Sequence, residues 1–226
     1  MAEASLAKSY DIVVVGGGPA GSSAAQAAAQ KGARVLIVER KQRIGLPVQC
    51  AEFVPQLISG YVRFSSQCVL KTIEMMITHL PDRTSHEMRS PGYMLDRSLF
   101  DKELVTSAIL SGAHISIETK AVDLSSNGII VEQGTEREAI QSKVIIGADG
   151  VHSSVASWVG QPREKTIVAL QYELVIPSPK NHVDVFFHPD YEGGYAWFFP
   201  KGKTANVGLG VIPRKTSSLP NLMNVF

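Results

Sequence analysis

Apolar residues along the chain follow two patterns, and each pattern predicts a different kind of structure. In the first part, short apolar runs at 11–15 and 143–147 enclose helix-like stretches at 20–30 and 96–111. Strands and helices in alternation predict an α/β domain with a mostly parallel sheet. After Pro162 the helical pattern stops, and strand-like segments follow one another with turn residues between them. This second part predicts a largely antiparallel β domain.

Weaker patterns fill the rest of the chain. Residues 69–80 alternate between apolar and polar side chains and predict a strand, whereas 81–91 form a polar excursion. Residues 52–59 are consistent with a short helix, and a Ser-Ser-Asn turn before Gly128 predicts a hairpin. The strands predicted beyond Pro162 are 166–176, 183–187, 195–199 and 205–211.

The first apolar run leads directly into a glycine-rich turn. Gly16, Gly18 and Gly21 form the pattern G-x-G-x-x-G, and a helix of small residues follows from Pro19 and Ala20. In this pattern the first glycine permits a tight turn, the second lets a pyrophosphate approach the backbone, and the third lets helix and strand pack closely. The helix N-terminus adds free N–H groups and a positive dipole end. The turn predicts a dinucleotide site, with a purely structural glycine turn as the alternative.

An acidic residue closes the next apolar run. Glu39 lies about 20 residues beyond the glycine turn, where a carboxylate can accept hydrogen bonds from a ribose 2′-OH. Arg40 follows it directly. We therefore expect both residues to belong to the cofactor site.

Composition narrows the classes of partner. The chain has 226 residues, a net charge of +1 and 44% hydrophobic residues, which allows one large or two small globular domains. The balanced charge argues against nucleic acid. The absence of a long apolar run argues against a membrane span, and the small, polar first residues argue against a signal peptide. We expect a cytoplasmic protein, with peripheral membrane contact left open.

The two cysteines give little indication of a metal site. Cys50 and Cys68 have no metal-ligand spacing, so we expect no metal site. Two isolated cysteines are consistent with a reducing compartment.

A second turn indicates which dinucleotide binds. The apolar run 143–147 delivers Asp149 to a sharp turn, and Gly150 relieves the steric cost of that turn. Together with the glycine-rich turn and Glu39, this resembles the Asp-Gly motif of the FAD-dependent aromatic hydroxylases and their relatives. The resemblance implies that Asp149 and Gly150 serve the pyrophosphate and ribityl part of FAD. The alternative is an Asx turn that caps a short helix beginning near Ser153.

Two further cofactor contacts rest on the same resemblance. The segment 96–104 is similar to the superfamily's Arg-x-x-Phe/Leu-Asp helix, in which the arginine lies near the flavin. This implies a flavin contact for Arg97, with a surface charge at a helix N-terminus as the alternative. Val122, in the first strand of the predicted hairpin, completes the implied cofactor set.

A narrower family resemblance comes from two other segments. Residues 194–201 resemble the Tyr-x-Trp-x-Phe-Pro element of geranylgeranyl reductases, and 49–52 resemble that family's Cys-Gly/Ala-Glu flavin loop, which places Cys50 and Ala51 at the cofactor. The resemblance extends over 10–211. It implies an enzyme that reduces isoprenoid C=C bonds with reduced FAD, with NAD(P)H or another reductant as electron donor. Flavin halogenases carry a similar aromatic motif, so a flavin monooxygenase or halogenase remains the alternative.

The aromatic element supplies candidates for catalysis. Tyr195, Trp197 and Phe199 alternate along a predicted strand and therefore share one face. Their rings suit an isoprenoid wall or a flavin lid, with a sheet core as the alternative. Cys50 is expected to donate a proton or to touch the flavin, although free cysteines are often simply buried. The predicted catalytic residues are Cys50, Tyr195 and Trp197.

These motifs also predict a division into domains. We expect a Rossmann-type FAD-binding domain of 1–66 and 93–164, and a substrate domain of 67–92 and 165–226. The superfamily's third FAD motif, a Gly-Asp-Ala turn beyond the substrate domain, is not found in 202–226. We therefore expect an incomplete substrate domain, completed by a partner chain or a further C-terminal segment. A non-catalytic FAD-binding protein is the third alternative.

Overall fold

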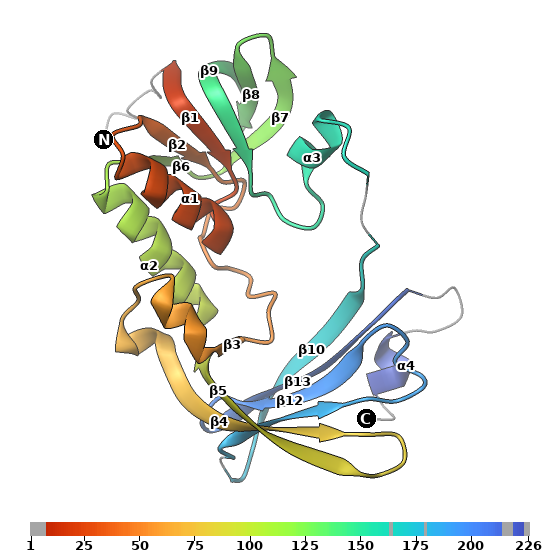
Figure 1. Ribbon diagram of the computed structural model, residues 1–226. Helices are drawn as coiled ribbons and strands as arrows, with labels where there is room; N and C mark the ends of the chain where they lie inside the picture. Colours follow the sequence, from red (N-terminus) through yellow and green to blue (C-terminus); the bar gives the residue numbers. More distant parts are fainter. Residues whose placement is uncertain (1–7, 163–164, 179, 214–218, 224–226) are drawn as a thin grey trace. The chain divides into compact units, whose positions relative to one another are not determined.

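The computed structural model describes residues 8–162, 165–178, 180–213 and 219–223, and the chain divides into two compact units (Figure 1). Unit 1 consists of Met1–Val48 and Ser98–Glu164. Unit 2 consists of Gln49–Arg97 and Lys165–Phe226. No helix among the described residues is long and apolar enough to cross a membrane.

The units differ from the expected domains at two boundaries. Residues 49–66 and 93–97 group with unit 2 rather than with the FAD-binding domain. The reason is strand pairing: β3 (Phe53–Pro55) pairs with the last residues of β5 (Ser85–Leu95), so both segments are tied to the second sheet. Unit 2 thus begins at Gln49, the first residue of the segment 49–52.

Unit 1 is built on one mixed sheet with the strand order β6-β2-β1-β9-β8-β7 (Figure 1). The four strands β6, β2, β1 and β9 run parallel, and β9, β8 and β7 continue as an antiparallel meander. Their bounds are Ser9–Val15 (β1), Val35–Val38 (β2), His114–Ser116 (β6), Thr119–Ser125 (β7), Gly128–Gln133 (β8) and Glu136–Gly147 (β9). This confirms the Rossmann-type α/β prediction.

The apolar residues of β1 divide between two cores because successive side chains of a strand point to opposite faces. Val14 packs with Ala25 of helix α1 (Pro19–Ala29) and Ala108 of helix α2 (Arg97–Leu110). Val13 and Val15 pack on the other face with residues of the meander and with helix α3 (Ser154–Trp158). Both sides of β1 are therefore buried, which fixes the start of the glycine turn.

Unit 2 is a second sheet with the order β10-β13-β12-β11-β4-β5-β3 (Figure 1). Every neighbouring pair is antiparallel except β11 and β4, which run parallel. The remaining elements are β4 (Val69–His79), β10 (Val168–Val175), β11 (His182–Phe186), β12 (Tyr195–Pro200), β13 (Thr204–Val211), the 3-10 helices η1 (Gln56–Gly60) and η2 (Ser66–Cys68), and α4 (Leu219–Met223). The prediction of a largely antiparallel second part is confirmed.

Two segments of unit 2 differ from what their sequence pattern indicates. Residues 85–91, which belong to the polar excursion 81–91, form most of β5, which pairs with β4. Pro91 fits there because the register shifts between Ile73 and Met75 of β4, where the ladder does not require its missing N–H. Residues 53–55, expected to be helical, form β3, and only a 3-10 turn follows.

Candidate functional site

The glycine turn of unit 1 has the close approaches that the sequence predicts. Gly16 adopts φ = +106°, and a Cβ there would overlap the carbonyl oxygen of Ala148. A Cβ at Gly21 would overlap the carbonyl oxygen of Gly16, so the helix lies directly on the turn. By contrast, no atom lies within 4 Å of a Cβ placed at Gly18. The backbone at Gly18 therefore faces open space at the N-terminus of α1, as a phosphate cradle requires.

Glu39 is bound into this turn. Its Oε2 accepts a hydrogen bond from the backbone N–H of Gly17 at 2.7 Å, and its Oε1 accepts one from Lys41 at 2.8 Å. The residue is only 9% exposed. Each carboxylate oxygen has two lone pairs, so acceptor capacity remains for a ribose. Sequence reasoning missed Gly17, because the G-x-G-x-x-G pattern assigns no role to that position.

Asp149 has the contacts of a helix cap. Its Oδ1 accepts from the Ser153 hydroxyl at 2.5 Å, and its Oδ2 accepts from the backbone N–H groups of Ser154 at 2.6 Å and Val155 at 3.3 Å. These bonds cap α3, as the alternative expects, but they reach five and six residues along the chain and not the two residues of an Asx turn. Gly150 adopts φ = +82°, and a Cβ placed on it would have no atom within 4 Å. A role for Asp149 and Gly150 at FAD stays a prediction.

The other predicted cofactor residues lie in both units. Arg40 is exposed just after β2. Val122 lies where the β7–β8 register shifts, between Ala121 and Asp123, so it is the extra residue of a bulge. Arg97 begins α2, and its backbone N–H donates to Glu52 in unit 2. None of these placements tests a flavin contact.

The segment 49–52 of unit 2, expected to contact the flavin, contains a buried charge. Glu52 is 3% exposed and adopts φ = +69°, an uncommon conformation for a residue other than glycine. Its Oε1 accepts from the Arg97 N–H at 3.2 Å. Its Oε2 accepts from Asn206 Nδ2 at 2.8 Å and from Lys201 Nζ at 2.5 Å. The carboxylate is thus fully partnered, as a buried charge requires.

Lys201 links Glu52 to a second acid. Burial opposes the charged form of Lys201, but the hydrogen bonds and charges of Glu52 and Glu173 outweigh it and raise the pKa of the ammonium group. Glu173 accepts from the Thr204 hydroxyl at 2.7 Å and lies 3.2 Å from Lys201 Nζ. The Thr204 bond first, and then Lys201, lower the pKa of Glu173 against the effect of burial. One lysine therefore neutralises part of the charge of two carboxylates.

The three predicted catalytic residues all belong to unit 2. Cys50 is partly exposed, and its Sγ accepts from the Glu52 N–H at 3.3 Å. Tyr195 and Trp197 make an edge-to-face pair with ring centroids 6.1 Å apart, and Phe199 lies 6.3 Å beyond Trp197. Tyr195 is 41% exposed, whereas Trp197 is 8% exposed and packs in the sheet core. The rings share one face, but only Tyr195 offers much surface to solvent.

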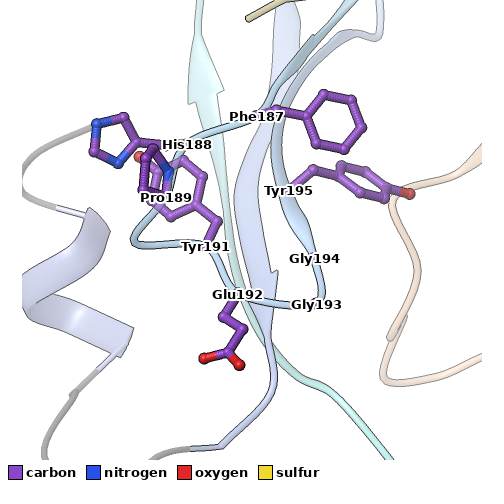
Figure 2. A pocket seen from close by; sticks show the side chains of 8 residues that line it. All are labelled: Phe187, His188, Pro189, Tyr191, Glu192, Gly193, Gly194 and Tyr195. Carbon is purple, nitrogen blue, oxygen red and sulfur yellow. The ribbon is translucent and has the colours of Figure 1, made fainter. Parts of the chain in front are cut away.

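Tyr195 also borders a hollow formed by the β11–β12 loop (Figure 2). The cavity has a volume of about 620 Å³ and is lined by residues 187–189 and 191–195. Figure 2 shows Phe187 and Tyr195 side by side, and their ring centroids are 6.0 Å apart. The hollow is therefore bounded on one side by an aromatic pair.

A larger cavity adjoins this hollow, because Phe187, His188 and Tyr191 line both of them. Its volume is about 950 Å³, and Phe186 and Phe198 line it together with Leu174. Phe198 alternates with Trp197 along β12, so this cavity opens away from the Trp197 face. Neither Cys50 nor Trp197 lines it.

Comparison with known proteins identifies the two parts of the chain. Residues 11–160 match the family FAD dependent oxidoreductase, and residues 166–226 match the geranylgeranyl reductase catalytic domain. The resemblance to geranylgeranyl reductases expected from the sequence is thereby confirmed.

Two of the similar curated proteins have the same name. A digeranylgeranylglycerophospholipid reductase of Methanocaldococcus jannaschii is 37% identical, over 94% of this chain and 58% of the relative. A protein of the same name from Methanosphaerula palustris is also 37% identical, over 91% of this chain and 56% of the relative. The chain thus spans rather more than half the length of the curated relatives that it matches.

Solved structures share the fold. A geranylgeranyl bacteriochlorophyll reductase-like protein from Thermoplasma acidophilum superposes with a TM-score of 0.89 at 28% identity, over 97% of this chain and 61% of that one. A myxobacterial chondrochloren halogenase superposes with a TM-score of 0.76 at 18% identity, over 97% of this chain and 57% of that one. At 18% identity the second likeness shows the fold alone. The match of residues 11–160 covers more than half of the chain, and its glycine turn has the geometry described above, so the chain belongs to the FAD dependent oxidoreductase family.

Proposed function

We propose that this protein reduces isoprenoid C=C bonds with reduced FAD. The observation that carries the proposal is the match of residues 166–226, which contain the Trp197 strand, to the geranylgeranyl reductase catalytic domain. The name of the M. jannaschii relative suggests geranylgeranyl chains on a glycerophospholipid as the first substrate to test. Because such a substrate resides in lipid, we also propose a cytoplasmic protein that works at the membrane surface.

The residues of unit 1 fit the cofactor. The open space at Gly18 leaves the backbone of the turn accessible, and the tight packing at Gly16 and Gly21 holds α1 with its N-terminus toward that space. Gly16, Gly18, Pro19, Ala20 and Gly21 would hold the pyrophosphate, and Glu39 would accept from the ribose. When bound and reduced, FAD supplies a hydride.

The residues of unit 2 would serve the substrate. Tyr195 offers exposed aromatic surface, with the Trp197 ring packed against it edge-to-face, and such a surface suits an isoprenoid chain because burial of apolar surface needs no directional partner. Reduction of a C=C bond also requires a proton at the second carbon. We propose that Cys50 holds this proton at Sγ, since its side chain is partly exposed.

Loss of the Glu39 carboxylate should weaken FAD binding. In Glu39→Ala the ribose loses its acceptor, and the N–H of Gly17 loses the bond that fixes the turn. Charge-assisted hydrogen bonds contribute about 1.5–3 kcal/mol each, so we expect the FAD dissociation constant to rise about ten- to hundredfold. Glu39→Gln, which keeps one acceptor oxygen, should fall between this variant and the wild type. Titration of the apoprotein with FAD measures the constants, and an unchanged value for Glu39→Ala would show that no ribose bond exists.

Loss of the Trp197 indole should affect turnover more than FAD affinity. We expect Trp197→Ala to lower kcat for a geranylgeranyl lipid about tenfold or more, as for loss of a residue that positions the reacting group. Phe199→Ala is the matched control, because Phe199 is buried in the same cluster on the same face. If the two variants lose activity and stability in parallel, Trp197 acts as a core residue and not at the substrate.

A further inference from the structure

The flavin-loop residues 50–52 are held by side chains from different strands of the unit 2 sheet. The carbonyl oxygen of Cys50 accepts from Gln171 Nε2 on β10 at 3.2 Å. The carbonyl oxygen of Ala51 accepts from Asn206 Nδ2 on β13 at 3.1 Å. The Glu52 carboxylate takes the bonds from Asn206 and Lys201 described above. Each of these consecutive residues is therefore tied to the sheet by a side-chain donor.

Gln171 also accepts a hydrogen bond, from a second candidate site residue. Its Oε1 accepts from the indole Nε1–H of Trp197 at 3.0 Å. An indole N–H can only donate and a backbone carbonyl can only accept. The side chain between them must therefore do both, which fixes the orientation of the Gln171 amide. This one amide connects the backbone of Cys50 to the side chain of Trp197.

The same arrangement carries a cost at Asn206. The residue is 1% exposed, and within the described part of the chain its Oδ1 has no hydrogen-bond partner. Buried polar groups without partners are destabilising and uncommon. The positive φ of Glu52 adds backbone strain at the neighbouring residue. An unpartnered buried amide oxygen and a positive φ are typical of segments that must keep one particular backbone geometry.

We propose that Gln171 is a positioning residue, which holds the Cys50 backbone and the Trp197 indole in a fixed mutual arrangement. Asn206 secures the next residue of the segment. The inference rests on the proposed function only in taking Cys50 and Trp197 as site residues. Loss of the amide should release the Cys50 segment from the sheet and make its thiol more accessible, with the fold of unit 2 intact.

Alkylation of the native protein tests this directly. Iodoacetamide should label the partly exposed Cys50, whereas Cys68 is fully buried and reports unfolding. Peptide mass spectrometry separates the two labels. In Gln171→Leu we expect Cys50 to react about three- to tenfold faster than in the wild type, which matches the loss of one hydrogen bond of ordinary net strength. The same exchange at an exposed glutamine of unit 1, Gln133→Leu, should leave the rate unchanged.

A double-mutant cycle tests the connection to Trp197. Trp197→Phe removes the indole N–H but keeps an aromatic ring in the core, and it should accelerate Cys50 alkylation too. If Gln171 connects Trp197 to the Cys50 backbone, the two substitutions remove the same connection. Cys50 in the double variant Gln171→Leu/Trp197→Phe should then be alkylated no faster than in Gln171→Leu alone. Independent, multiplying effects would overturn the proposal, as would a Gln171→Leu rate within twofold of the wild type.

The labelling of Cys68 controls for unfolding, and the measurement does not depend on reductase activity. Should Gln171→Leu also expose Cys68, the variant has unfolded, and Trp197→Phe decides: faster Cys50 labelling with Cys68 protected supports the link, and an unchanged rate refutes it. Reductase activity plays no part in the measurement. A protein that fails to reduce isoprenoids but shows the non-additive alkylation pattern would refute the proposed function and leave the positioning role of Gln171 standing.

Discussion

Replacing Gly18 by valine is expected to abolish FAD binding while unit 1 remains folded. Gly18 has φ = −76° and ψ = −178°, an extended conformation that valine adopts readily. No protein atom lies within 4 Å of the new Cβ, so the fold has room for the side chain. The same space is the one that a pyrophosphate would enter. Purified Gly18→Val protein should therefore show a folded circular dichroism spectrum and no flavin absorbance.

Gly21 provides the matched contrast. A Cβ at Gly21 would overlap the Gly16 carbonyl oxygen, and it would lie 3.2 Å from the Ala148 side chain. Gly21→Val should therefore lose its flavin because the β1–α1 packing fails, with a clearly lower melting temperature. Full flavin occupancy in a folded Gly18→Val protein would mean that the cofactor does not approach this turn.

Removing the Lys201 ammonium group is expected to cost unit 2 much of its stability. Lys201→Met leaves the 3% exposed Glu52 carboxylate without its cation. Breaking one side of a buried ion pair typically costs about 3–5 kcal/mol. Lys203→Met, at an exposed lysine two residues later, should change the free energy of unfolding little. Urea unfolding of the three proteins measures the difference, and equal midpoints would show that the pair contributes nothing.

The pH dependence of that difference has a definite sign. The folded pKa of Lys201 is raised above its ordinary value of 10.5, so the pair contributes its full stability below pH 10.5. The contribution is lost as the pH rises through the raised folded value. The destabilisation of Lys201→Met should therefore be constant between about pH 7 and 9 and shrink only in strongly alkaline solution. A difference that disappears already near neutral pH would contradict this account.

The cofactor turn was predictable because its determinants are local. Gly16, Gly18 and Gly21 lie within six residues of one another, and close contacts between neighbouring elements require glycine at Gly16 and Gly21. The hydrogen bond from Gly17 to Glu39 was not predictable, since it joins residues 22 positions apart through a backbone N–H that every residue type except proline carries.

The antiparallel character of unit 2 was predictable, but two of its segments depend on contacts distant in sequence. The polar residues 85–90 carry no strand pattern, yet pairing with β4 makes them a strand. The sequence pattern of residues 53–55 predicts a helix, but their pairing with β5 makes them the strand β3. Gln171 and Asn206, the partners of Cys50 and Ala51, lie 121 and 155 residues from the atoms that they hold. No periodicity or motif of a single sequence encodes such pairs.

Single-turnover reduction tests the central claim most directly. The purified protein, loaded with FAD and reduced by dithionite under anaerobic conditions, is incubated with a digeranylgeranyl glycerophospholipid, and the lipid is analysed by mass spectrometry. Long incubation allows even slow turnover to be detected. The account predicts that the lipid gains two hydrogen atoms for each double bond reduced, and that the flavin absorbance returns as it does so. A bound, fully reduced flavin beside a lipid of unchanged mass would contradict it, and a product formed only when oxygen is admitted would point to monooxygenase chemistry instead.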